Sequence, residues 1–194
     1  YRIGTTRDGF TVFYQYDIMD RCRTGKIIPY DPHTGHRIKD GSVPEAMWVH
    51  SRLKAMHQLP DGWTLSQCLF GEHLLPLYPD LPVALVEAEK TAVICSAVFP
   101  EFLWLATGGL SQFNDRVNVL LGRKVIAIPD LGGYELWRKK AQEYPLLDII
   151  VSDYLEKNAT PELREIGADL ADWVVEERMA EGIGIQSGIC CDEK

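Results

Sequence analysis

The sequence has no Cys-x-x-Cys pair, no Walker-type phosphate loop and no apolar run near the ~20 residues that span a bilayer. These absences exclude a P-loop nucleotidase and a helical membrane protein, and they leave no visible zinc-binding module. Cysteine is scarce, with 5 residues, an odd number without paired spacing. We therefore expect a reduced, cytoplasmic protein with core thiols. The cysteines are Cys22, Cys68, Cys95, Cys190 and Cys191.

No repeat or low-complexity segment interrupts the chain, and its 46% hydrophobic and 25% charged residues are typical of a soluble globular protein. The net charge of -8 hides an asymmetry, because residues 1–60 carry nine Lys/Arg against six Asp/Glu and the remainder carries 11 against 22. An acidic total argues against non-specific nucleic-acid binding by the whole surface. A basic N-terminal face and an acidic crevice for a divalent cation both remain open. The chain starts at Tyr1 without Met or a signal-type segment, so we expect it to be part of a longer protein.

The hydrophobic pattern divides the chain in two and predicts a mixed α/β fold. Alternating apolar residues over 9–20, a second run at 24–30 and a Pro/Gly turn before 37–39 predict a small antiparallel β-meander. Helices are expected at 46–56 and 64–69. Beyond Leu81 strands and helices alternate, which is typical of a parallel sheet flanked by helices. The expected strands are 82–87, 102–106, 124–129 and 147–151, and the expected helices are 89–98, 111–121, 134–143, 153–158 and 161–181.

These patterns predict three parts: a meander-plus-helix segment at 1–68, an α/β domain at 69–182 and a flexible tail at 183–194. Two apolar strands of the α/β domain end in carboxylates, Glu87 and Asp130. Ligands of open α/β sheets bind outside the carboxyl ends of the strands, so the two side chains can share Mg²⁺ or form an acid–base pair. The simpler interpretations are that Glu87 caps the next helix and that Asp130 closes a turn.

Three further features have both a functional and a structural interpretation. Gly108 and Gly109 follow a strand, where they either expose backbone N–H groups to a phosphate or form a tight turn. Asp169 and Asp172 share one side of a helix, where they either extend the acidic crevice or face solvent. A pair of histidines, with Cys22, either binds metal or lies exposed in a turn, and exposure is favoured. These histidines are His33 and His36.

A basic–aromatic face is the last candidate. Lys26, Arg37 and Lys39, with Phe13 and Tyr14, have the composition that binds single-stranded nucleic acid, although an ordinary charged edge explains them as well. For three other histidines the sequence offers no recognisable nucleophile motif, such as a nucleophile elbow, so we assign them no catalytic role. They are His50, His57 and His73.

Residues 86–92 (VEAEKTA), 105–109 (LATGG) and 128–130 (IPD) resemble the Toprim domain of topoisomerases and bacterial-type primases, and more narrowly the primase-like Toprim proteins of phages and mobile elements. The resemblance extends over about residues 69–175, and residues 169–173 (DLADW) are similar to the acidic segment that closes primase Toprim domains. It implies that Glu87 acts in acid–base catalysis or metal coordination and that Asp130 holds Mg²⁺ or Mn²⁺. The glycines at 108–109 and Lys90 would approach phosphate. Residues 1–68 resemble the template-holding region that precedes Toprim in primases.

The sequence departs from the family pattern at Ala88, where Gly is usual, and at Gly132, which replaces the second metal-binding Asp. Because Mg²⁺ is often held by one or two carboxylates plus substrate phosphates and water, Glu87 and Asp130 can suffice, aided by Asp169 or Asp172 and with the metal bound weakly until substrate arrives.

The leading hypothesis is Mg²⁺-dependent nucleotidyl or phosphoryl transfer on DNA or RNA in replication or mobilisation of DNA. Its partners would be a single strand, nucleoside triphosphates and a replicative helicase, with no membrane. The alternatives are a non-catalytic, Toprim-derived module that binds nucleic acid or protein, which Gly132 favours, and a small nucleotide-binding enzyme unrelated to replication.

Overall fold

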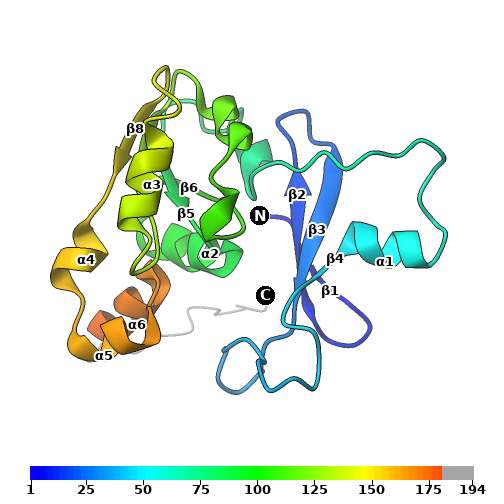
Figure 1. Cartoon of the computed structure of the whole chain (residues 1–194), viewed down its shortest axis with the longest axis horizontal. Helices are drawn as coiled ribbons and strands as arrows, with labels where there is room; N and C mark the ends of the chain where they lie inside the picture. Colours follow the sequence, from blue (N-terminus) through cyan, green and yellow to red (C-terminus); the bar gives the residue numbers. More distant parts are fainter. Residues whose placement is uncertain (181–194) are drawn as a thin grey trace, which may run out of the picture.

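The computed structural model describes residues 1–180, so the predicted tail at 183–194 lies outside the described residues. Two four-stranded sheets form the fold, one antiparallel in the order β1-β2-β3-β4 and one parallel in the order β6-β5-β7-β8 (Figure 1). The predicted fold class, a helix-flanked parallel sheet preceded by an antiparallel sheet, is confirmed. The strands are β1 Ile3–Thr5, β2 Thr11–Tyr16, β3 Cys22–Ile28, β4 Met47–Trp48, β5 Val83–Val86, β6 Leu103–Ala106, β7 Lys124–Ile128 and β8 Asp148–Val151.

Six α-helices and three 3-10 turns connect the strands within residues 1–180. They are α1 Val49–Ala55, η1 Glu72–Leu74, α2 Glu89–Val98, η2 Leu110–Gln112, η3 Asp115–Leu120, α3 Tyr134–Ala141, α4 Tyr154–Asn158, α5 Pro161–Ile166 and α6 Leu170–Ala180. No helix in this part of the chain is both long and apolar enough to cross a membrane.

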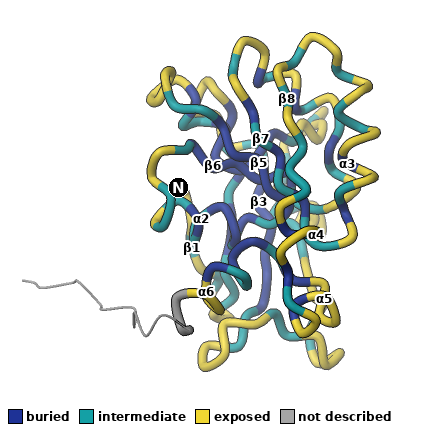
Figure 2. The backbone as a smooth tube through the Cα atoms, turned by 90° about the vertical axis from the view of Figure 1, so that its left-hand side faces the viewer, coloured by how far each residue is buried: buried dark blue, intermediate teal, exposed yellow. Residues whose placement is uncertain are grey.

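Both faces of the parallel sheet are covered, which is why its strands are continuous apolar runs. Ala84 and Val86 of β5 face a core that includes α2 and α6, whereas Val83 and Leu85 face a second core with η3 and Trp137 of α3. Figure 2 shows β5, β6 and β7 as buried stretches at the centre, with exposed residues concentrated on outer elements such as α5. The sheet is therefore a rigid support for whatever lies at its strand ends.

The antiparallel sheet differs from the predicted meander in its outer strands. The strand expected at 37–39 is reduced to a single bridge between Tyr30 and Arg37. In its place β4 pairs with β3, and the short β1 pairs with β2. Asp31 explains the difference, because its carboxylate accepts backbone N–H groups of residues 33 and 34 and turns the chain before a strand can form.

Three predicted helices are altered. The helix expected at 64–69 is absent, and the nearest turn is η1. The helix expected at 111–121 is broken into η2 and η3. Asn114 lies between the two, and its side chain accepts the Arg116 N–H and so caps the start of η3. The helix expected at 161–181 is divided into α5 and α6, with α5 ending at a left-handed Gly167.

Aromatic side chains join the two sheets. Phe70 forms a backbone bridge with Ala106 of β6, stacks on Tyr1 at 5.2 Å and meets Phe13 of β2 edge-on at 5.6 Å. The Tyr1 hydroxyl donates to the Trp104 carbonyl at 2.9 Å. The antiparallel sheet is therefore packed against the α/β part through a shared core, and polar groups on β3 can reach the strand ends.

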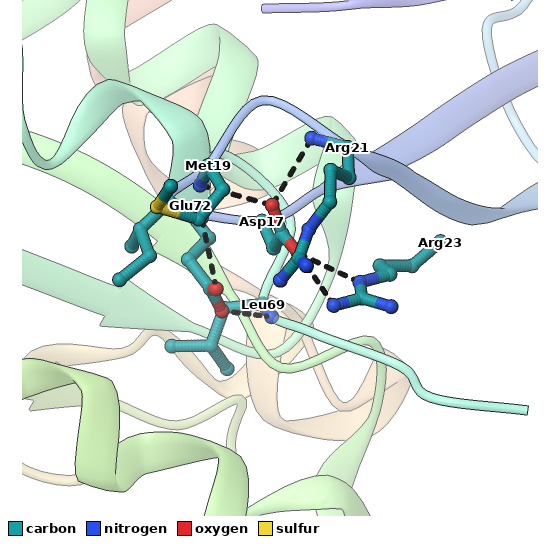
Figure 3. Close-up of polar contacts among 7 residues, drawn as sticks. Asp17, Met19, Arg21, Arg23, Leu69 and Glu72 are labelled. Atoms are coloured by element: carbon teal, nitrogen blue, oxygen red, sulfur yellow. Dashed lines mark hydrogen bonds and ion pairs between the residues drawn. The ribbon is translucent and has the colours of Figure 1, made fainter.

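A polar cluster, Asp17 with Arg21 and Arg23, adds to this junction (Figure 3). Asp17 accepts from Arg21 Nε at 2.9 Å and Arg23 Nε at 2.7 Å, and also from two backbone N–H groups. Burial alone would raise the pKa of Asp17, but these hydrogen bonds outweigh it and lower the pKa from 3.8 to about 2. The neighbouring Glu72 accepts backbone N–H groups of Ile18 and Leu69, linking the cluster to the segment before β5.

Asp17→Asn is expected to destabilise the protein by about 2 kcal/mol at pH 7, because one pKa unit corresponds to about 1.4 kcal/mol. The folded pKa lies below the unfolded value, so this stabilisation is present above pH 4 and is lost as the pH falls towards 2. Urea denaturation at pH 7 and pH 2.5 checks the prediction. Asp20→Asn, which removes an exposed pair with Arg2, is the control and should change little. An equal loss at both pH values would contradict the charge-based account.

Candidate active site at the strand ends

The carboxyl ends of β5, β6 and β7 bring the predicted acidic residues together. Val86 pairs with Ile128 of β7 and with Ala106 of β6, so the residues that follow all three strands lie at one edge. Glu87 follows Val86 directly, and the Asp130 backbone N–H donates to Glu87 Oε1 at 3.1 Å. Adjacent parallel strands thus bring Glu87 and Asp130 together at one edge of the sheet, where the Glu87 carboxylate contacts the Asp130 backbone.

Glu87 is buried and does not cap the following helix. Helix α2 has no side-chain cap, and the hydrogen bond that Glu87 accepts comes from Asp130 instead. Burial raises the pKa of Glu87 above its ordinary value, against the effect of the Asp130 N–H, and the negative charge of Asp169 adds to the increase. The ionised form of the Glu87 carboxyl group is therefore less favourable than that of a carboxyl group in water, which favours a role in proton transfer or cation binding.

Asp130 is the most strongly perturbed acid of the edge. Burial is the largest cause, and together with the charges of Glu87, Asp169 and Asp172 it raises the pKa of Asp130 from 3.8 to about 8, against the opposing charge of Lys90. Its ionised form is therefore costly unless a cation comes near. Several acidic side chains in a partly buried site repel one another and lose solvation. Binding of a proton or a divalent cation therefore stabilises such a site.

Asp169 and Asp172 lie close enough to contribute charge, and they also have a clear structural role. The Asp172 N–H donates to Asp169 Oδ1 at 2.9 Å and the Asp169 N–H donates to Asp172 Oδ2 at 3.2 Å. This reciprocal arrangement is a capping box at the start of α6. Asp169 Oδ2 also accepts from Thr91 Oγ1 of α2 at 2.7 Å, so the box ties α6 to the helix that begins beside Glu87.

The glycine turn after β6 adopts a conformation that requires glycine, with φ values of +91° at Gly108 and +150° at Gly109. The Gly108 N–H donates to the Glu87 carbonyl at 2.9 Å, so it is already satisfied. The Gly109 N–H makes only a 3.4 Å contact with Thr107 Oγ1. Of the two amides proposed for phosphate approach, Gly109 is the one available.

Lys26 lies in the crevice and not on an exposed face. Its side chain is only 11% exposed, and Nζ donates to the Gly108 carbonyl at 2.7 Å and approaches Glu89 Oε2 at 3.4 Å. Glu89, at the start of α2, is buried, and its Oε1 has no hydrogen-bond partner among the described residues. The sequence analysis missed Glu89. The available signal was its position two residues after Glu87, at the start of the predicted helix.

The remaining parts of the predicted basic–aromatic face do not meet. Arg37 is partly exposed and Lys39 is exposed, both on the loop after β3. Phe13 is buried against Phe70, whereas Tyr14, its neighbour on the strand, lies on the opposite side against Gly25. His33 and His36 are exposed in the turn made by residue 31.

Within residues 1–180 no group of three or more His, Cys, Asp or Glu side chains has the arrangement of a complete metal site. Gly132, at the position where the Toprim resemblance led us to expect a second metal-binding Asp, has a φ of +87° and donates its N–H to Glu156 Oε1 at 2.8 Å. The donors at the edge are therefore a carboxylate pair, Glu87 and Asp130, with the buried and unpaired Glu89 Oε1 nearby. Carboxylate oxygens suit Mg²⁺ or Mn²⁺ when substrate and water supply the other ligands.

The fold resembles solved primase structures. The chain is similar to the primase fragment of the bacteriophage T7 primase-helicase protein, with a TM-score of 0.53 and 14% identity, over 93% of this chain and 64% of that one. The E. coli primase catalytic core matches with a TM-score of 0.49 and 16% identity, over 92% of this chain and 61% of that one. The RNA polymerase domain of the Mycobacterium tuberculosis primase DnaG matches with a TM-score of 0.48 and 12% identity, over 92% and 64%. At such identities the likeness establishes the fold.

Sequence comparison gives one further finding. The family described as "Domain of unknown function (DUF6371)" matches residues 1–131, which include the antiparallel sheet, β5 to β7, Glu87 and Asp130. No curated protein matches the chain.

Proposed function

Because the chain belongs to the DUF6371 family and has a fold similar to that of a phage primase fragment, we propose that it is a Toprim-type, primase-like protein. Its activity would be Mg²⁺- or Mn²⁺-dependent nucleotidyl or phosphoryl transfer on nucleic acid, in replication or mobilisation of DNA. The observation that carries the proposal is that β5 and β7 bring Glu87 and Asp130 together, with the Asp130 backbone N–H donating to Glu87 Oε1 at 3.1 Å. The chain spans 64% of the T7 fragment, so the activity of a whole protein belongs to this proposal as well.

Each residue at the carboxyl ends of β5, β6 and β7 would have its own role in the reaction. When bound, the divalent cation would neutralise developing phosphoryl charge and orient the triphosphate. Asp130, whose ionised form needs a neighbouring cation, would be the main ligand. Glu87, with its raised pKa, would share the ligand role or move the proton of the attacking hydroxyl. Lys90 and the Gly109 N–H would receive phosphate oxygens.

The partners that this chemistry requires are nucleoside triphosphates and a single strand of DNA or RNA, with a replicative helicase as the natural neighbour. Arg37 and Lys39, which are accessible, are the better placed of the predicted nucleic-acid contacts. Lys26 would act from inside the crevice, by holding the Gly108 carbonyl and Glu89 beside the metal ligands.

Calorimetric titration of Mn²⁺ into the protein with a non-hydrolysable nucleoside triphosphate tests the proposal. Glu87→Gln keeps an acceptor for the Asp130 N–H but removes the charge, so it is expected to weaken Mn²⁺ binding about tenfold or more. Glu135→Gln is the matched control, because Glu135 is exposed on α3 and its ion-pair partner within residues 1–180 is Arg138. Equal Mn²⁺ affinity in wild type and Glu87→Gln would reject the assignment of this residue.

A non-catalytic module is the second candidate, and Gly132 favours it. A residue with a side chain at that position would need the strained φ of +87°, and the Gly132 N–H is already used by Glu156. The loop conformation at position 132 therefore suits glycine and would be strained by an aspartate. The absence of Mn²⁺ binding at millimolar concentration with nucleotide, together with retained nucleic-acid binding, would favour this candidate.

A further inference from the structure

Helix α1, the strand before it and the loop that follows it form an aromatic site that does not include the strand-end acids. Trp48, His50 and Trp63 make a column of three rings, with centroids 5.7 Å apart for the first pair and 5.8 Å apart for the second. His50 and Trp63 are nearly parallel, at 24°. Figure 1 shows α1 on the outer side of the antiparallel sheet, away from the parallel sheet. The rings themselves begin on the face of β3 that carries Lys26, because Trp48 pairs directly with Lys26 and His50 contacts Thr24 on that face.

The column is held in place by the strand beneath it. His50 Nδ1 lies 2.7 Å from Thr24 Oγ1, and Thr24 is a buried residue of β3. Trp48 belongs to β4, whose backbone pairs with β3 at Lys26. Two of the three rings are thus fixed by the sheet, and a preformed aromatic surface loses little conformational entropy when a ligand binds.

A cavity of about 470 Å³ opens beside the column. Its walls are mostly apolar or aromatic, and its polar side chains include the cation Lys54 and the carboxylate Asp61. Such a composition suits a flat heteroaromatic ring attached to an anionic group. The lining residues are His50, Lys54, Leu59, Pro60, Asp61, Gly62, Trp63 and Leu65.

Lys54 is the cation that an anionic strand requires at the cavity, because Arg52 pairs with Asp8 Oδ2 at 3.7 Å and Asp61 is the carboxylate of the cavity wall. Residues 47–60 contain Arg52, Lys54 and two histidines but no Asp or Glu, in a chain whose net charge is -8. No residue of α1 is buried, and Lys54 makes no ion pair within the described part of the chain. A basic, exposed helix beside stacked aromatic rings is the combination that single-stranded nucleic acid recognises.

We infer that the cavity beside Trp48, His50 and Trp63 binds one nucleobase of a single-stranded nucleic acid. The base stacks on the Trp63 column, Lys54 receives an adjacent phosphate and Asp61 accepts an N–H of the base. The inference deepens the proposed function and rests on it, since it names residues other than the strand-end acids with which the protein holds a strand.

Fluorescence anisotropy with a labelled oligothymidylate and an abasic strand of equal length tests the inference on the 194-residue chain. Trp63→Leu keeps an apolar side chain but loses the π-face, and it should weaken oligothymidylate binding between about 5- and 100-fold. Its affinity for the abasic strand should be unchanged, because that strand has phosphates but no bases. Trp63→Phe, which restores a ring, should bind oligothymidylate nearly as wild type does.

Salt dependence tests the phosphate contact separately. Lys54→Ala should reduce the slope of log K against log salt by about 0.7, the value for one phosphate contact to a single strand. Lys139→Ala is the matched control, since Lys139 is an exposed lysine in the last turn of α3, and its slope should equal that of wild type.

Three outcomes of the variant and competition measurements would overturn the inference. They are undiminished oligothymidylate binding by Trp63→Leu, an equal loss on the abasic strand, and competition by polyglutamate as effective as competition by oligothymidylate, which would identify an acidic protein partner. If Trp63→Leu fails to fold, the oligothymidylate affinity of Trp63→Phe and the salt slope of Lys54→Ala decide whether the inference holds. Absence of strand binding by wild type would also overturn it, whereas the Mn²⁺ titration of the carboxylate pair would still judge the proposed function on its own.

Discussion

Asp130→Asn is expected to make the metal-free protein more stable at pH 8, and to abolish the stabilisation that Mn²⁺ gives to wild type. Burial and three neighbouring acids raise the pKa of Asp130 from 3.8 to about 8, so its ionised form opposes folding. Because Asp130 is only half-buried, solvent screens part of this effect. We therefore expect the free energy of unfolding to rise by about 1–2 kcal/mol in the variant. This corresponds to a melting temperature higher by about 2–8 °C.

The pH dependence has a definite sign. The folded pKa of Asp130 lies above the unfolded value, so its stabilising contribution is complete below pH 4 and is lost as the pH rises through 8. The advantage of Asp130→Asn should therefore be absent at pH 4 and largest at pH 8. Mn²⁺ binds the ionised carboxylate and should raise the melting temperature of wild type but not of the variant.

Thermal unfolding with and without Mn²⁺, at both pH values, checks this prediction. Asp148→Asn is the control, because Asp148 is an exposed acid at the start of β8, at the opposite end of the strands. A lower melting temperature for Asp130→Asn at pH 8, combined with an intact response to Mn²⁺, would contradict the account of this residue.

Lys26→Met is expected to be the most destabilising single change at the junction of the two sheets, at about 3–5 kcal/mol. It leaves Glu89, which is 1% exposed, as an unpaired buried charge, and it removes the donor at 2.7 Å from the Gly108 carbonyl. Removing one partner of a buried pair costs more than replacing both, since the remaining charge keeps its desolvation penalty.

The double variant Lys26→Met with Glu89→Gln separates the charge effect from packing. It should recover most of the stability that Lys26→Met loses, because no charge remains unpaired. Urea denaturation of both single variants and the double variant measures the coupling. If the double variant is as unstable as Lys26→Met alone, the loss arises from packing and the ion pair is not its cause.

The strand-end acids could be predicted from sequence because the argument needs only local patterns. A buried parallel strand is a continuous apolar run, and its first polar residue lies at the carboxyl end, as Glu87 does. The strand order cannot be derived in this way. The Asp130 N–H reaches Glu87 because β5 and β7 are neighbours in the order β6-β5-β7-β8, which follows from long-range packing.

Lys26 shows why the rest could not be predicted. Strand alternation places Lys26 on the same side as Thr24 and Ile28, but it does not say which side another part of the chain covers. Asp169 carried a clearer signal that was not used, because Gly167 two residues earlier ends one helix and makes Asp169 the cap of the next. The Trp48–His50–Trp63 column joins a strand, a helix and a loop, and no local spacing predicts it.

Crystals soaked with Mn²⁺ and a nucleoside triphosphate give the most direct test of the central claim. The account predicts an anomalous peak within oxygen–metal distance, about 2 Å, of both the Glu87 and the Asp130 carboxylates, with the triphosphate completing the coordination. A triphosphate bound at the strand ends with no anomalous peak there, or an ion whose only protein ligands lie elsewhere, would contradict it.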